Sequence, residues 1–114
     1  MFSLSPATAI YLHQPATDFR KGIDGLLGIV KRTLTEIDPM AGAVFVFLNK
    51  SRKSLRLLFY DGQGFWLCQK RLSTSRFPFH PLNHEMFARM LLPQLLVLAH
   101  GGDFQKLRLA PQFR

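Results

Sequence analysis

Three consecutive apolar runs, joined by very short connections, most strongly limit what this chain can fold into. The runs AVFVFL, LRLLFY and FWLCQKRL occupy residues 43–48, 55–60 and 65–72, and NKSRKS and DGQG connect them. Connections of this length are typical of hairpins, because parallel neighbours need a crossover of a dozen or more residues. We therefore expect an antiparallel three-stranded meander. The first run is apolar throughout, which indicates a central strand covered on both faces.

The residues before the meander predict one strand and one helix. TAIYLH, at residues 8–13, is typical of a short strand and is followed by Pro15. Apolar residues then recur at helical spacing as far as Leu34. Thr17 or Asp18 is the expected cap, since either side chain can accept from the exposed first-turn amides.

The residues after the meander predict a second helix. The segment 75–83 is too rich in proline for regular structure. A helix is expected from about Asn83, kinked or divided at Pro93 and ended by Gly101 and its neighbouring glycine. The basic tail, residues 104–114, contains one more possible strand.

Length and composition complete the fold prediction. The chain has 114 residues, of which 47% are hydrophobic, enough for one packed core. We expect a single α+β domain over residues 1–114. It has a small, mainly antiparallel sheet, formed by the three-strand meander plus the N-terminal strand, packed with two principal helices. A single cysteine and the lack of a signal peptide or membrane span favour a cytoplasmic location.

Positive charge is the main functional signal. The chain has 15 Lys and Arg against 7 Asp and Glu, a formal charge of +8, which favours a polyanionic partner, nucleic acid first. If residues 55–60 pair with 65–70, Arg56 lies near Lys70, at the end occupied by the NKSRKS connection. Six cations would then lie together at this end and would contact several phosphates. The alternative is that these charges only keep an exposed sheet edge soluble. They are Lys50, Arg52, Lys53, Arg56, Lys70 and Arg71.

Arg20 and Lys21 are second-rank candidates for the same role. In the first turn of the expected helix they oppose the dipole preference for acids. Together with the N-terminal amides they would receive a phosphate. The alternative is a structural salt bridge from Arg20 to Asp24, four residues later. Both interpretations remain open.

Catalysis and metal binding find little support. Asp18 and Asp24 lie six residues apart, so one helix would direct them away from each other, and Asp61 is typical of a turn. Pro81 separates His80 from the only nearby histidine. Cys68 is expected to be a small buried hydrophobe. We therefore predict no catalytic residue, no metal site and no cofactor.

Several ordered motifs resemble one family. They are DFRKGIDGL (18–26), the long segment 42–72 and RFPF (76–79). Their most specific residues are Asp18, Arg20, Lys21, Gly22, Asp61, Gly62, Gly64, Leu67, Lys70, Arg71, Leu72 and Phe77. Over residues 9–105 the chain is similar to the TnpB accessory protein, the second reading frame of bacterial insertion-sequence-66 elements.

The resemblance implies a non-enzymatic accessory protein of DNA transposition, with DNA at the element ends and the transposase as partners. The basic residues would then bind backbone phosphates. The alternative is a module that docks on the transposase with little DNA contact. The aromatic residues Phe59, Tyr60, Phe65 and Trp66 fit base stacking, a contact with the transposase or, more simply, the core.

Overall fold

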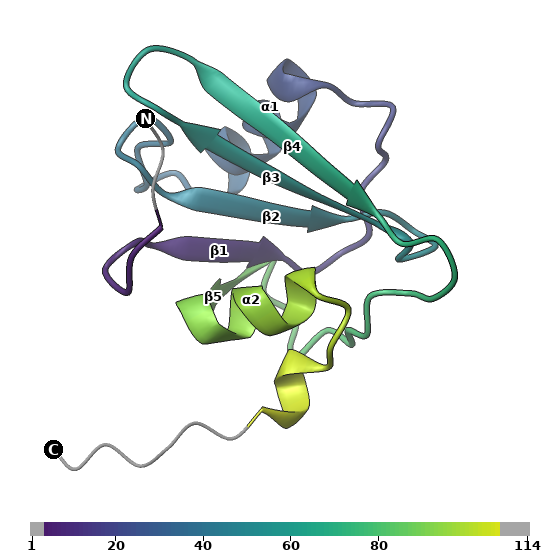
Figure 1. Ribbon diagram of the computed structural model, residues 1–114. Helices are drawn as coiled ribbons and strands as arrows, with labels where there is room; N and C mark the ends of the chain where they lie inside the picture. Colours follow the sequence, from purple (N-terminus) through teal and green to yellow (C-terminus); the bar gives the residue numbers. More distant parts are fainter. Residues whose placement is uncertain (1–3, 108–114) are drawn as a thin grey trace, which may run out of the picture.

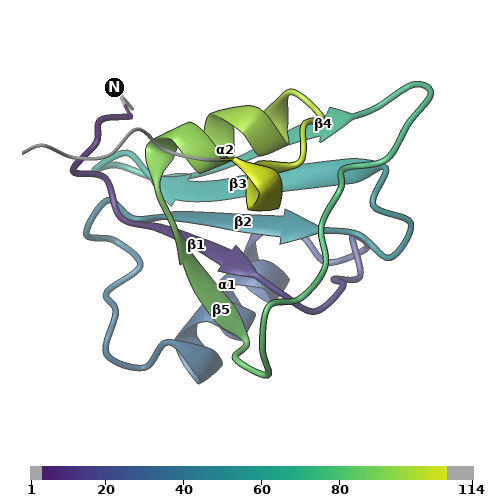
Figure 2. The same ribbon diagram turned by 90° about the horizontal axis from the view of Figure 1, so that it is seen from below.

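The chain forms a five-stranded sheet between two helices. The computed structural model describes residues 4–107, and its strands follow the order β4-β3-β2-β1-β5. Helix α1 lies on one face of the sheet and α2 on the other (Figure 1, Figure 2). The elements are β1 (Ile10–His13), α1 (Ile23–Thr33), β2 (Val44–Leu48), β3 (Ser54–Tyr60), β4 (Phe65–Arg71), β5 (Phe87–Met90), α2 (Leu92–Ala99) and the 3-10 turn η1 (Phe104–Lys106).

The predicted meander is confirmed. β2 pairs antiparallel with β3, and β3 with β4. Every residue of β2 is buried, as expected for a central strand. Its alternating side chains divide between two apolar clusters, with Val44 and Val46 facing α2 and Phe45 and Phe47 facing α1.

The sheet is larger and more mixed than the sequence indicated. β1 pairs parallel with β2, because α1 lies between them in the chain and provides the crossover. The prediction of four strands was incomplete, since β5 adds antiparallel to the other edge of β1. Residues 87–90 had been assigned to the second helix. Phe87 and Met90 are three residues apart, a helical spacing, but in β5 they pack on opposite faces of the sheet.

Both helices begin later than predicted. α1 begins after Gly22, not at a cap of Thr17 or Asp18, because the Asp18 carboxylate accepts from the backbone N–H of Arg20 at 2.9 Å. α2 begins after Leu91, and Pro93 lies in its first turn, where a missing N–H costs nothing. Proline therefore starts this helix and does not kink it.

The remaining expectations divide. Helix α2 ends at Ala99, just before the predicted glycines. Cys68 is exposed on β4, so the prediction of a buried thiol was wrong. The strand suggested within 104–114 is replaced by η1 at its start, and residues 108–114 lie outside the described part. Among residues 4–107, the helices are too short or too polar to cross a bilayer.

Candidate nucleic-acid interface

The loop between β2 and β3, residues 49–53, is held by backbone hydrogen bonds on several sides. The Asn49 side-chain oxygen accepts from the N–H of Ser54 at 3.1 Å. The Arg52 carbonyl accepts from the N–H of Phe77 at 2.7 Å, and the Lys53 carbonyl from Leu72 at 2.8 Å. The loop is thereby fixed to the segment that follows β4.

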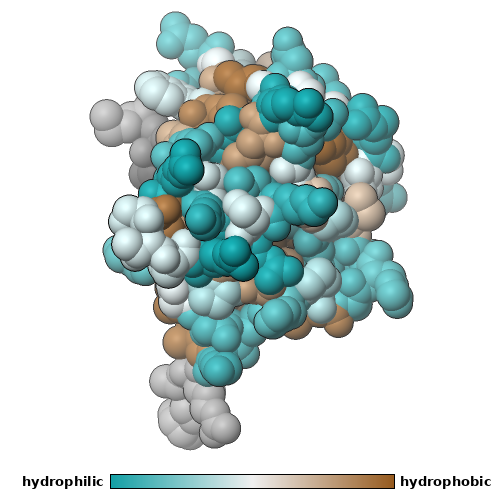
Figure 3. Space-filling view, turned by 90° about the vertical axis from the view of Figure 1, so that its right-hand side faces the viewer, coloured by the Kyte–Doolittle hydropathy of each residue, from teal (hydrophilic) through white to brown (hydrophobic). Residues whose placement is uncertain are grey.

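Cations project from this fixed loop and from the adjoining end of β4. Within residues 4–107, the side chains of Lys50, Arg52, Lys53 and Arg71 form no hydrogen bond or ion pair, and all but the half-buried Arg52 are exposed. We call these four residues the basic end. Their charges are therefore not neutralised by partners among the described residues. Figure 3 views the molecule from this side, and hydrophilic residues cover much of the face.

Arg52 has a backbone conformation that suits the fixed loop. Its φ is +60°, in the left-handed region that a non-glycine residue adopts only at some cost. Its N–H donates to the Asn49 carbonyl at 3.0 Å while its own carbonyl accepts from Phe77. Bonds on both sides of Arg52 thus hold the turn that presents Lys50 and Lys53.

Arg56 differs from the basic end because its guanidinium is already engaged. It donates to the Gln69 side chain at 2.6 Å and to the Lys21 carbonyl at 2.8 Å. Its Cζ also lies 4.4 Å from the centre of the Phe19 ring. Arg56 therefore fastens the segment before α1 onto the sheet.

Lys70 lies on the opposite face of the sheet from Arg56. Its Nζ donates to the Ala99 carbonyl at 2.7 Å, at the C-terminal end of α2, where a positive charge complements the helix dipole. The expectation that all six cations converge is therefore wrong in part. Arg56 faces Gln69 across the strands, and Leu55 faces Lys70, so alternation separates the two cations.

Arg20 and Lys21 precede α1 and do not occupy its first turn. Arg20 forms a salt bridge with Asp18 at 2.7 Å, so the alternative partner Asp24 was also wrong. This interaction lowers the pKa of Asp18 to about 2. The Lys21 ammonium makes no described hydrogen bond or salt bridge, although its charge also helps to lower the Asp18 pKa. Arg20 and Lys50 line one hollow of about 620 Å³, between residues 16–20 and 49–51.

The residues considered for catalysis are not brought together. Among the described residues, no group of three His, Cys, Asp or Glu side chains is placed to hold a metal ion. Asp61 builds its turn, accepting from the N–H groups of Gln63 and Gly64 and from Trp66 Nε1 at 2.7 Å. These bonds, led by that from Trp66, lower the Asp61 pKa to about 2.

His13 is the buried histidine. Its Nδ1 lies 3.0 Å from Thr17 Oγ1, and Nε2 has no hydrogen-bond partner. The rings of Phe47 and Phe87 lie 5.5 and 4.9 Å from it. Burial lowers the His13 pKa, because the charged form would lose its hydration.

The four aromatic residues beside the 61–64 turn divide between the faces. Phe59 is buried in the core, while Trp66 is 54% exposed and stacks on Phe59 with 6.5 Å between ring centres. Tyr60 and Phe65 contact each other, with 4.9 Å between ring centres. The core interpretation thus holds for Phe59 and not for Trp66.

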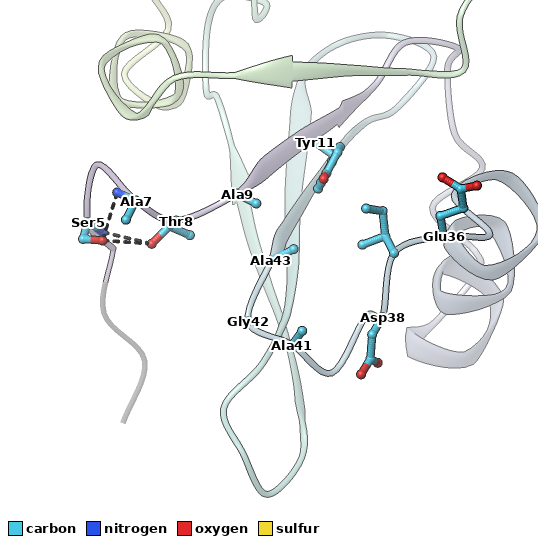
Figure 4. A pocket seen from close by; sticks show the side chains of 11 residues that line it. Ser5, Ala7, Thr8, Ala9, Tyr11, Glu36, Asp38, Ala41, Gly42 and Ala43 are labelled. Carbon is cyan, nitrogen blue, oxygen red and sulfur yellow. Dashed lines mark hydrogen bonds between the residues drawn. The ribbon is translucent and has the colours of Figure 1, made fainter.

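The opposite end of the sheet carries a second hollow, of about 470 Å³. Figure 4 shows Glu36 and Asp38 on one side of it and Ser5, Ala7 and Thr8 on the other. The two hollows therefore differ in charge: Arg20, Lys50 and one carboxylate, Asp18, line the first, whereas the charged residues that line the second are Glu36 and Asp38.

One cation near the loop was left out of the predicted set. Arg76 is exposed and adjoins Phe77, whose N–H is bonded to Arg52. The available signal was its position in the RFPF segment, which the proline-rich composition marked only as irregular.

Comparison with known proteins identifies one family and two relatives. A family model described as "IS66 Orf2 like protein" matches residues 8–109. "Uncharacterized protein y4jC" of Sinorhizobium fredii is 31% identical over 111 residues, covering 97% of this chain and 93% of that protein. "Uncharacterized protein y4hO" of the same species is 39% identical over 61 residues, 54% of this chain and 52% of that one. No solved structure matches the chain significantly.

Proposed function

The chain belongs to the IS66 Orf2-like family, and from this premise we propose that it is a non-enzymatic accessory protein of DNA transposition. It binds nucleic acid through the basic end and assists the element's transposase in the cytoplasm. Lys50, Arg52, Lys53 and Arg71 hold backbone phosphates, as Lys and Arg side chains do in protein–DNA complexes generally.

The observation that carries this proposal is that the side chains of these four cations have no partner within the described residues, although the 49–53 loop and the end of β4 that bear them are fixed. Free charges on a rigid support bind phosphates with little loss of backbone freedom. The chain's net charge of +8 adds attraction at long range.

The other predicted contacts have secondary roles in the proposal. Lys21 and Arg20 extend the basic end toward the 620 Å³ hollow, with Arg20 first releasing Asp18. Arg56 and Lys70 remain candidates for phosphate contact, but their described hydrogen bonds indicate mainly structural roles. A readout helix in the major groove is not part of the proposal, so we expect weak sequence preference.

The second candidate function is a docking module for the transposase with little direct DNA contact. Trp66 favours it, because an exposed tryptophan is typical of the centre of a protein interface. Such a module would bind the transposase even at high salt, whereas phosphate contacts weaken steeply as salt rises.

The test is DNA binding by fluorescence anisotropy as the salt concentration is raised. The probes are a duplex from an element end and a scrambled duplex of the same length. Four phosphate contacts predict a slope of log affinity against log salt of about −4 on duplex DNA. The Lys50→Ala/Lys53→Ala variant should have a slope smaller by about 2.

The matched control is Lys31→Ala/Arg32→Ala, which removes two exposed cations from the last turn of α1. The affinity of this control should stay within about twofold of the unmodified chain. Equal losses in the two variants would show that net charge alone matters. No binding to either duplex at low salt would refute DNA contact and leave transposase docking.

A further inference from the structure

β4 offers an open sheet edge. It ends the strand order, so one edge pairs with β3 and no described strand pairs with the other (Figure 1). Five of its seven residues are exposed. β5, the strand at the other end of the sheet, has only four residues. A long exposed edge is a template for pairing with another strand unless something covers it.

Two hydrogen bonds establish which β4 residues direct their backbone groups outward. The Asp61 N–H donates to the Gly64 carbonyl, and the Leu72 N–H to the Lys53 carbonyl. Bonded pairs in an antiparallel ladder alternate with non-bonded pairs, so every second residue of β4 faces β3. The backbone N–H and C=O groups of Trp66, Cys68 and Lys70 therefore point toward β3. Those of the other four residues point outward, to the open edge; these residues are Phe65, Leu67, Gln69 and Arg71.

We propose that two copies of the chain pair antiparallel through β4, about a two-fold axis at Cys68. Leu67 then faces Gln69 of the second copy, and Phe65 faces its Arg71. This register uses all four outward residues and forms about eight backbone hydrogen bonds. A shift by two residues in either direction leaves part of the edge unpaired.

The side chains favour the same register. β4 has aromatic residues at its start and cations at its end. Antiparallel pairing about Cys68 therefore places Arg71 against Phe65, an arrangement that permits a cation–π contact, and no two like charges face each other. On the other face, the Lys70 ammonium stays bound to Ala99, so its aliphatic stem lies against the exposed Trp66 of the second copy.

The arrangement also separates the two basic ends. Antiparallel strands place the 49–53 loop of each copy at opposite ends of the combined sheet. Repulsion between two chains of charge +8 is thereby reduced. Arg71 belongs to both the β4 edge and the basic end, so the pairing engages one of these four cations and leaves Lys50, Arg52 and Lys53 free for phosphate. The pairing itself rests on the β4 edge and not on the proposed function.

Oligomeric mass and cysteine cross-linking test the pairing. The Cys68→Ser variant cannot form a disulfide. As its concentration is raised to roughly 100 µM, its mass measured by sedimentation should reach twice 13.1 kDa. The Cys68 residues form a non-bonded pair with Cα atoms about 4.5 Å apart, inside the range of disulfides. A mild oxidant should therefore link the unmodified chain rapidly into a dimer.

The discriminating variant is Cys68→Lys, which places two ammonium groups face to face at the axis and should be monomeric. Because the Cys68 side chain is exposed, we expect the substitution to leave the monomer fold intact, and Cys68→Ser is the matched control. A monomeric Cys68→Ser chain at the highest concentration would overturn the proposal, even if oxidation slowly links the unmodified chain. A Cys68→Lys chain that stays dimeric would place the interface elsewhere and equally overturn it.

Discussion

The two ends of the sheet use their charged residues in opposite ways. At the end with the 61–64 turn, Asp61 and Asp38 accept hydrogen bonds from the backbone N–H groups of their own turns. At the basic end, the side chains of Lys50, Lys53 and Arg71 make no hydrogen bond or ion pair within the described residues. The acids therefore stabilise the fold, whereas these cations are available to a ligand.

The comparison shows why net charge alone says little about function. Of the cations grouped by sequence, Arg56 and Lys70 resemble the acids, because both are bound within the molecule. Charges that the fold already uses are poor candidates for ligand contacts. The free charges at a fixed loop are better ones.

The largest effect is expected from reversing charge at the basic end. Lys50→Glu/Lys53→Glu should lower DNA affinity about 100-fold, since it removes two attractions and adds two repulsions. Glu36→Lys, at the opposite end, should change affinity less than about twofold. Anisotropy at one fixed salt concentration measures both. A rise for Glu36→Lys as large as the double variant's loss would contradict the distinction between the ends.

A second prediction concerns Arg56, a basic residue that the fold uses. Arg56→Gln should lower the free energy of unfolding by about 2 kcal/mol, because it removes a charged hydrogen bond to the Lys21 carbonyl and the contact with Phe19. Urea denaturation measures the loss. DNA affinity of the folded variant should stay within about threefold. A stable Arg56→Gln chain that fails to bind DNA would instead place Arg56 with the ligand-binding cations.

The support of the loop gives a third prediction. Asn49→Ala should cost about 1 kcal/mol of stability, since the Ser54 N–H loses its side-chain acceptor. It removes no charge, yet it should weaken DNA binding severalfold by loosening the loop. Denaturation and anisotropy on one preparation test both effects. Unchanged DNA affinity would show that the loop needs no fixed shape.

The smallest effect comes from pH. The folded-state pKa of His13 lies below its ordinary value of 6.5, so the unfolded chain binds the proton more readily. Its contribution to stability is full above pH 6.5 and is lost as the pH falls from that value through the lower folded-state pKa. Denaturation between pH 7.5 and 5.5 should show a loss that His13→Phe reduces. At the end with the 61–64 turn, the pKa of Asp61 is lowered to about 2, so its contribution to stability is lost only as the pH falls below about 4.

The sequence predicted the parts of the fold that depend on neighbours in the chain. Hairpin-length connections were sufficient for β2, β3 and β4. The pairing of β1 with β2 and β5 depends on distant residues, so spacing could not reveal it. The helix predicted over residues 86–91 was wrong because their apolar positions fit a helix as well as a strand. Pro93 distinguishes the two only once it is recognised as a helix start.

The candidate site was predicted in part for a similar reason. Strand register correctly placed the 49–53 loop beside the end of β4. The alternation of side chains along a strand places Arg56 and Lys70 on opposite faces, so the sequence already contained the signal that separates them. The contacts of Arg56 with the Phe19 segment depend on where that segment packs, and no short-range pattern indicates this.

The position of β1 has a consequence for synthesis on the ribosome. Ile10 pairs with Val44 on one side and with Met90 on the other, so β1 is made first and completed last. β2, β3 and β4 can associate as soon as they emerge, because their contacts are local. Until residue 90 leaves the ribosome, the nascent chain exposes a strand edge beside a forming core. Slow translation after β4 would therefore favour association between neighbouring nascent chains.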